Sequence, residues 1–160
     1  EADWTLIGEV KNNSRIKIPI IGNGDITRPE QAKEFFNRYG VDAIMIGRAA
    51  IGQPWIFSEM KHVLDVNFEY SPLSFEEKKD VLKNYILSAV RRLDIDEQTP
   101  IESVYDKHLK GIVHSRRHLA ATSIFKNIPN FKSTRIAMLR ADTLSELFGI
   151  MDSVHEPFCN

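Results

Sequence analysis

The sequence predicts an α/β segment followed by an all-α segment, and two observations support this prediction. Residues 16–22 and 41–47 are short runs rich in β-branched and other apolar residues, and a helical stretch with short turns lies between them. This order is typical of a βαβ unit with parallel strands. Strand-like runs then stop, so we expect one domain over 1–66, a hinge over 66–73 and a helical domain over 74–155.

Proline and glycine fix the expected boundaries of the α/β segment. The first strand begins at or just after Pro19, because proline cannot donate a ladder hydrogen bond. Pro29 suits the first turn of the next helix, and Gly40 suits the position just after its end. Buried strands are therefore expected within 16–22 and 41–47, and helices over 4–11, 29–40 and 54–64.

The all-α segment opens with a capping box. Residues 74–77 read Ser-Phe-Glu-Glu, in which the serine caps the helix and the second glutamate reaches back to the serine amide. Residues 143–146 form a second box, Thr-Leu-Ser-Glu. We expect a bundle of about four helices. The acids of residues 76–80 are expected to lie on a solvated surface, and Lys78 and Lys79 in this acidic helix start are expected to contribute little to RNA binding. The helices are expected over 75–93, 104–121, 132–140 and 144–153.

Composition excludes several classes of protein. The chain is 42% hydrophobic and 27% charged, which is ordinary for a globular protein, and no apolar run approaches the roughly 20 residues of a membrane span. The single cysteine, Cys159, cannot form an internal disulfide, which fits a cytoplasmic protein. His114 and His118 have helical i, i+4 spacing but lack a nearby carboxylate or thiol, so no metal site is expected.

Glycine-rich turns follow both predicted strands. Gly22-Asn23-Gly24-Asp25 follows the first, and Gly47-Arg48 follows the second. Glycines let backbone N–H groups approach an anion, and arginine can grip a phosphate with two hydrogen bonds. Two successive strand ends of this kind match the phosphate site that often follows strands 7 and 8 of a (β/α)8 barrel.

Three stretches, 18–26, 40–50 and 52–57, closely resemble the tRNA-dihydrouridine synthases. They read Ile-Pro-Ile-Ile-Gly-Asn-Gly-Asp-Ile, Gly-Val-Asp-Ala-Ile-Met-Ile-Gly-Arg-Ala-Ala and Gly-Gln-Pro-Trp-Ile-Phe. The Pro-Trp-Ile-Phe segment separates this family from other flavin barrels. The resemblance is dense over 1–60 and looser over 74–150.

The resemblance implies a fold and an activity. The chain would be the C-terminal part of an FMN-binding TIM barrel, with two βα units, followed by a helical tRNA-binding domain. The family reduces uridine to dihydrouridine in tRNA with NADPH as the reductant of FMN. Matched by motif, the residues that would hold the FMN phosphate are Asn23, Gly24, Asp25, Gly47 and Arg48.

No catalytic residue can be carried over from the family. Its catalytic cysteine lies in the first half of the barrel, and Cys159 matches no such motif. We therefore expect the chain on its own to be inactive.

Positive charge is concentrated in one stretch. Residues 107–141 contain eight Lys or Arg and no Asp or Glu, whereas the rest of the chain has 13 basic and 22 acidic residues. Helical spacing puts Lys107, Lys110, His114, Arg117 and His118 on one face, opposite Leu109, Ile112, Val113 and Leu119. Such a face suits the phosphate backbone of RNA. The expected RNA-binding residues are Lys107, Lys110, Arg116, Arg117, Lys132, Arg135 and Arg140; Lys126 is the eighth basic residue.

Two other functions stay open at this point. One is an FMN-dependent TIM-barrel oxidoreductase acting on a small molecule, which would not need a basic helical surface. The other is a non-catalytic RNA-binding helical module. An incomplete barrel would also expose sheet edges through which copies of the chain could self-associate.

Overall fold

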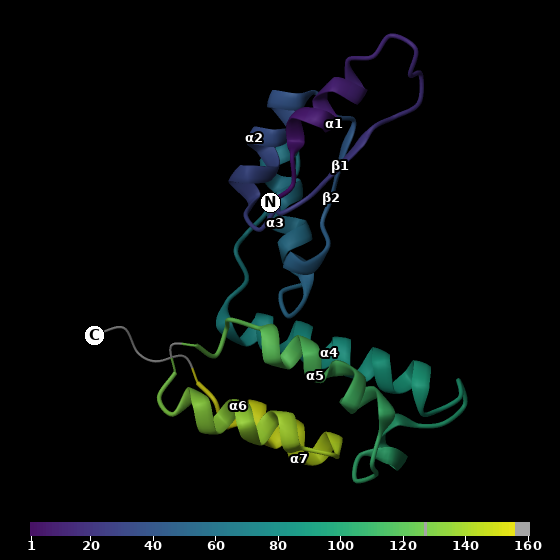
Figure 1. The fold of residues 1–160 in the computed structure, drawn as a ribbon. Helices are drawn as coiled ribbons and strands as arrows, with labels where there is room; N and C mark the ends of the chain where they lie inside the picture. Colours follow the sequence, from purple (N-terminus) through teal and green to yellow (C-terminus); the bar gives the residue numbers. More distant parts are fainter. Residues whose placement is uncertain (127, 156–160) are drawn as a thin grey trace. The chain divides into compact units, whose positions relative to one another are not determined.

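The computed structural model describes residues 1–126 and 128–155, which fall into two compact units. The first spans Glu1–Pro72 and the second begins at Leu73. The first contains three α-helices around a small parallel sheet, and the described part of the second contains four α-helices (Figure 1). No helix in these residues is long and apolar enough to cross a membrane.

The first unit follows the expected helix and strand order. Its elements are α1 (Trp4–Lys11), β1 (Ile21–Asn23), α2 (Pro29–Tyr39), β2 (Ala43–Met45), the 3-10 helix η1 (Arg48–Ala50) and α3 (Ile56–Leu64). The strands pair in parallel, with Gly22 opposite Ile44. Gly40 ends α2 with a left-handed φ of 64°, as its position predicts.

At the start of the strand pair, the Asp42 amide donates to the Ile20 carbonyl at 2.9 Å, and the Asp42 side chain replaces a backbone acceptor. The Asp42 carboxylate accepts the amide of Ile20 at 2.7 Å and pairs with Lys11 Nζ at 2.6 Å. The Ile20 amide is therefore used by a side chain rather than by the opposite strand. At the other end, Gly24 and Asp25 have positive φ angles and leave the extended conformation.

The prediction of two buried strands is wrong for Ile21 and Met45. Gly22 is the buried residue of β1, with Trp4 against it, whereas Ile21 and Met45 are 60% and 54% exposed. Alternate residues of a strand face opposite sides, so only one face of the pair is covered. On the covered side a core forms from Trp4, Ile26, Ala32, Val41, Ile56 and Met60.

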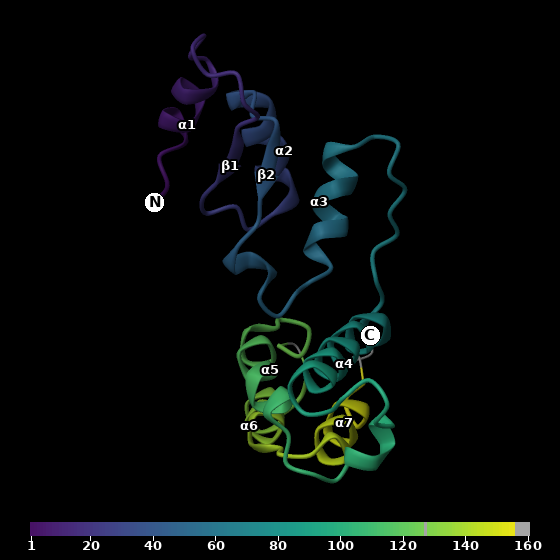
Figure 2. The same ribbon diagram turned by 90° about the vertical axis from the view of Figure 1, so that its right-hand side faces the viewer.

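The second unit is a helical bundle with elements α4 (Phe75–Leu93), the 3-10 helix η2 (Ile101–Val104), α5 (Lys110–Ala121), α6 (Phe131–Arg140) and α7 (Leu144–Asp152). Successive helices are neighbours, as Figure 2 shows in a view along the bundle. The first capping box is formed in both directions between Ser74 and Glu77. In the second, Thr143 caps the Glu146 amide, but the glutamate accepts the Asp142 amide instead of that of Thr143.

The helix expected from 104 begins only at Lys110. The Asp94 carboxylate accepts the amides of Lys110 and Gly111 at 2.8 and 2.7 Å and so caps the helix from another part of the chain. Gly111 then packs directly on α4, where an added Cβ would lie 2.4 Å from the amide nitrogen of Val90. This glycine therefore allows α4 and α5 to approach closely.

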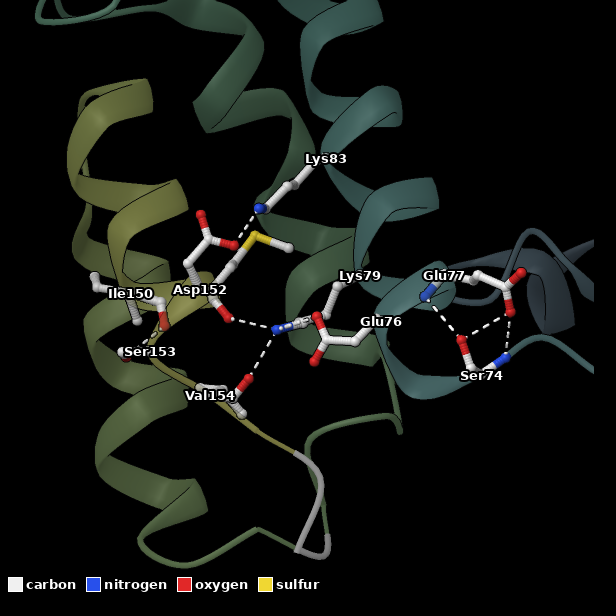
Figure 3. Close-up of polar contacts among 10 residues, drawn as sticks. Ser74, Glu76, Glu77, Lys79, Lys83, Ile150, Asp152, Ser153 and Val154 are labelled. Atoms are coloured by element: carbon white, nitrogen blue, oxygen red, sulfur yellow. Dashed lines mark hydrogen bonds and ion pairs between the residues drawn. The ribbon is translucent and has the colours of Figure 1, made fainter.

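Lys79, in the acidic start of α4, is buried. Its side chain is 2% exposed, and its ammonium donates to the carbonyls of Val154 at 2.8 Å and Met151 at 3.4 Å (Figure 3). Glu76 completes the site with an ion pair of 2.9 Å. Because these carbonyls lie at and beyond the C-terminal end of α7, where a cation is favourable, Lys79 fastens α4 to that end.

Candidate functional site

The carboxyl ends of β1 and β2 border a crevice of about 740 Å³. All five residues predicted to hold a phosphate line it, together with five further residues. The lining consists of Ala2, Asn23, Gly24, Asp25, Ile26, Thr27, Met45, Gly47, Arg48 and Ala49. The parallel pairing of the strands explains this convergence, because it brings both following turns to the same edge.

Two glycines shape the backbone of this crevice. Gly24 has a φ of 143°, and an added Cβ would lie 2.3 Å from the Cβ of Ala2. The indole of Trp4 donates to the Gly24 carbonyl at 2.9 Å and holds the turn in place. At Gly47, by contrast, an added Cβ would meet nothing within 4 Å. The Gly47 backbone is therefore open to a group in the crevice.

An ion pair crosses the crevice between the two turns. Arg48 Nη2 lies 2.8 Å from Asp25 Oδ1, and Asp25 Oδ2 accepts the amide of Ala2 at 2.8 Å. The side chain of Arg48 is 88% exposed. An exposed pair of this kind contributes only about 0–1 kcal/mol, so an incoming dianion can compete for the guanidinium. Asp25, whose φ is 51°, thus orients Arg48 across the crevice.

The exposed basic residues of the stretch 107–141 lie on α5, on α6 and in the segments next to these helices. Lys107, Lys110, Arg117, Lys126, Lys132 and Arg140 are all exposed. Arg116 differs, because it is partly buried and donates to Asp142 at 2.7 Å and to the Ala141 carbonyl at 3.2 Å. Arg135 is also half-buried, and its Nε has no hydrogen-bond partner among the described residues.

The predicted division of α5 into two faces needs a correction. Val113, expected on the apolar face, is 54% exposed, and His118, expected on the basic face, is half-buried against the ring of Tyr85 at 4.2 Å between centroids. Since α4 packs on Gly111, the buried arc is centred on Gly111, Ser115 and Leu119. The exposed stripe therefore consists of Lys110, Val113, His114 and Arg117.

Burial lowers the pKa of His118 below its ordinary value of 6.5, and the positive charges of Arg117 and His114 lower it further. His118 is therefore neutral at neutral pH. Lys110 and Arg117 supply permanent positive charge to the stripe.

Sequence reasoning missed Ala2 and Ala49 in the crevice and Asp94 and Lys79 in the bundle. Ala2 reaches the crevice only because Trp4 docks on Gly22, which no local pattern reports. Thr27 had a signal, since it lies two residues after the glycine-rich turn. In the part of the chain that the structure describes, no three His, Cys, Asp or Glu residues are grouped closely enough to hold a metal ion.

The chain thus combines a βα segment, with a crevice at the carboxyl ends of its two parallel strands, and a helical bundle with exposed lysine and arginine residues. Comparison with known proteins assigns the family. A family model described as dihydrouridine synthase (Dus) matches residues 1–141, so the chain belongs to the dihydrouridine synthase family.

Three curated relatives, all called tRNA-dihydrouridine synthase B, support this assignment. The protein from Shewanella oneidensis is 34% identical over 118 residues, which are 74% of this chain and 32% of that protein. Those from Proteus vulgaris and Escherichia coli are 44% and 46% identical over 86 and 82 residues, or 54% and 51% of this chain. The matches span 26% and 25% of these two relatives, so the chain corresponds to about a quarter to a third of each protein.

Proposed function

We propose that this chain serves tRNA dihydrouridine synthesis, as the part of a flavin-dependent tRNA-dihydrouridine synthase that holds the FMN phosphate and binds tRNA. The observation that carries the proposal is the crevice at the carboxyl ends of β1 and β2, which gathers all five residues of the phosphate motif. FMN, when bound, would supply the hydride that reduces the uracil ring, with NADPH as its reductant.

The residues of the crevice fit a phosphate monoester. Gly47 offers open backbone, and Gly24 holds a turn that a side chain would block. Arg48 would bind the phosphate, Asn23 would donate from its amide, and Asp25 would keep the guanidinium over the crevice. A hydrogen bond from a charged donor contributes about 1.5–3 kcal/mol, which makes Arg48 the main source of affinity in this group.

The helical unit would bind tRNA through its exposed cations. Five of the seven predicted RNA-binding residues are exposed, namely Lys107, Lys110, Arg117, Lys132 and Arg140. Arg116 and Arg135 are less available, since the first is held by Asp142 and both are half-buried. Phosphate contacts of this kind give affinity that falls with salt and depends little on sequence.

The chain on its own is proposed not to catalyse the reduction of uridine in tRNA. The family's proton donor is a cysteine within a motif that these 160 residues do not contain. Phosphate and tRNA binding would remain, because both sets of residues are present.

Salt dependence of tRNA binding tests the proposal. With five to seven phosphate contacts at about 0.9 each, log affinity should fall against log salt with a slope of roughly −4 to −6. Replacing Lys110 and Arg117 with Glu should flatten the slope by about two and weaken all tRNAs alike. The matched control replaces Lys17 and Lys33, exposed lysines outside the basic stretch, with Glu.

Equal effects of the two pairs of substitutions, or no binding even at low salt, would refute the tRNA-binding role. The alternative of a helical RNA-binding module without a cofactor predicts the same tRNA result but no difference in FMN affinity between the chain and its Arg48→Ala variant. A small-molecule oxidoreductase predicts no salt-dependent tRNA binding.

A further inference from the structure

A second crevice lies within the helical unit, between α4 and α5. It has a volume of about 320 Å³ and is lined by Tyr85, Ser88, Ala89, Arg92, Leu93 and His114. Five of these residues belong to α4. Ser88, Ala89, Arg92 and Leu93 follow Tyr85 by three, four, seven and eight positions, so the five side chains lie on one face of the helix. His114 comes from the exposed stripe of α5, between Lys110 and Arg117.

The close approach of the two helices explains the shape of this crevice. The backbones meet at Gly111, where an added Cβ would lie 2.4 Å from the Val90 amide nitrogen and 2.7 Å from the Ala89 carbonyl carbon. Ser88 and Ala89 are short, whereas Tyr85 and Arg92 on either side of them are long. Short side chains therefore form the bottom of the crevice, with the Tyr85 ring at one end and the Arg92 guanidinium at the other.

The charge of the crevice favours an anion. Arg92 and His114 are exposed, and no carboxylate belongs to its lining. The carboxylate next along α4, that of Asp94, already accepts the amides of Lys110 and Gly111. A phosphate at Arg92 would thus meet the guanidinium with no carboxylate of the lining to oppose it.

The aromatic end of the crevice is ordered before any ligand arrives. The Tyr85 ring packs on the His118 ring with centroids 4.2 Å apart and planes 38° apart. Burial keeps His118 neutral at neutral pH, so the ring pair carries no charge of its own. A fixed, neutral aromatic ring beside exposed cations is the arrangement on which proteins stack single-stranded bases.

We propose that this crevice binds one unstacked nucleotide of an RNA strand, with its base on Tyr85 and its phosphate on Arg92. The inference deepens the proposed function and rests on it, because the neighbouring stripe of α5 is proposed to bind tRNA. The volume lies at the lower end of the range of about 300–1,000 Å³ typical of small-ligand sites, as a single nucleotide requires.

The test measures binding of the 160-residue chain to hexauridylate, a single strand with little stacking, and to an RNA duplex of the same length. The chain should prefer the single strand. Tyr85→Leu should weaken hexauridylate binding by about 5- to 150-fold, the range of one stacked base, and Tyr85→Phe should retain it. Arg92→Ala should weaken binding more than Arg91→Ala, the matched control on the same helix, because Arg91 is exposed but does not line the crevice.

Ser88→Trp provides a second variant if Tyr85→Leu disturbs folding. Ser88 is exposed, so a tryptophan there should fill the crevice without removing a core contact, and it should weaken hexauridylate binding. Unchanged affinity in both Tyr85→Leu and Ser88→Trp would overturn the inference, as would equal effects of Arg91→Ala and Arg92→Ala. A crevice that serves a protein partner would give this negative result.

The two proposals fail in different ways. If tRNA binding responds to reversal of Lys110 and Arg117 but not to Tyr85→Leu or Ser88→Trp, the nucleotide site is refuted and the tRNA-binding role stands. If the chain binds hexauridylate in a Tyr85-dependent manner but does not bind tRNA, the nucleotide site stands and the tRNA-binding role is refuted.

Discussion

Replacement of the buried Lys79 should destabilise the helical unit, and the contacts of its ammonium group set the size of the loss in free energy of unfolding. Lys79→Met keeps most of the stem but leaves the carbonyls of Val154 and Met151 without the ammonium that they bind. Loss of the donor to a buried group costs about 1–3 kcal/mol. The loss of the ion pair to Glu76 adds little, because that carboxylate is 64% exposed. We therefore expect Lys79→Met to lower the free energy of unfolding by about 1–3 kcal/mol.

Urea denaturation followed by far-ultraviolet circular dichroism measures this change, with Lys83→Met as the control. Lys83 lies one turn further along α4 and pairs with Asp152, which is 60% exposed, so its loss should cost about 0–1 kcal/mol. Lys79→Glu should cost more than Lys79→Met, because it places a carboxylate against two carbonyls and Glu76. A stability of Lys79→Met equal to that of the unchanged chain, or a larger loss in Lys83→Met, would show that the ammonium does not fasten α4 to α7.

Four further predictions concern the sites. In a full-length synthase, Arg48→Ala should weaken FMN binding by about 1.5–3 kcal/mol in a flavin fluorescence titration, and an unchanged affinity would remove Arg48 from the phosphate site. The chain alone with FMN, NADPH and unmodified tRNA should yield no dihydrouridine by nucleoside mass spectrometry; turnover above a no-protein control would contradict this. Asp142→Asn frees Arg116, so tRNA affinity should rise and its salt slope should steepen by about one, whereas a weaker complex would assign Asp142 to RNA recognition. The lowered pKa of His118 means that the unfolded chain binds more protons, so the stability from this group is present above pH 6.5 and is lost as pH falls through the lowered pKa; His118→Gln should flatten that dependence in urea melts at several pH values.

Local patterns predicted the helices of this protein better than its strands. The first capping box, Pro29 and Gly40 all act at the ends of helices, where one or two side chains decide the outcome. The pairing at the start of the strands depended instead on Asp42, whose carboxylate accepts the amide of Ile20, 22 residues earlier in the chain. Similarly, the start of α5 was misplaced because its cap, Asp94, lies 16 residues before Lys110. A hydrogen-bond partner this far away in the sequence cannot be recognised from the residues next to the strand or the helix start.

That the five predicted residues line one crevice could be foreseen because they are consecutive residues after each strand. Parallel pairing then brings the two turns together without further information. The ion pair between Asp25 and Arg48 could not be predicted in this way, since it depends on the unusual φ of Asp25 and on its bond to the Ala2 amide.

The basic stretch shows how a count of charges differs from a charged surface. Residues 107–141 contain no acid, yet Asp142 follows immediately and binds Arg116 at 2.7 Å, with His108 at 3.8 Å. One nearby carboxylate thus removes an arginine from the surface that the count predicted. Lys110 and Arg117 gain importance for the same reason, because they stay exposed on either side of His114. If the helical unit binds RNA, its affinity depends on this stripe of α5 more than on the total charge of the stretch.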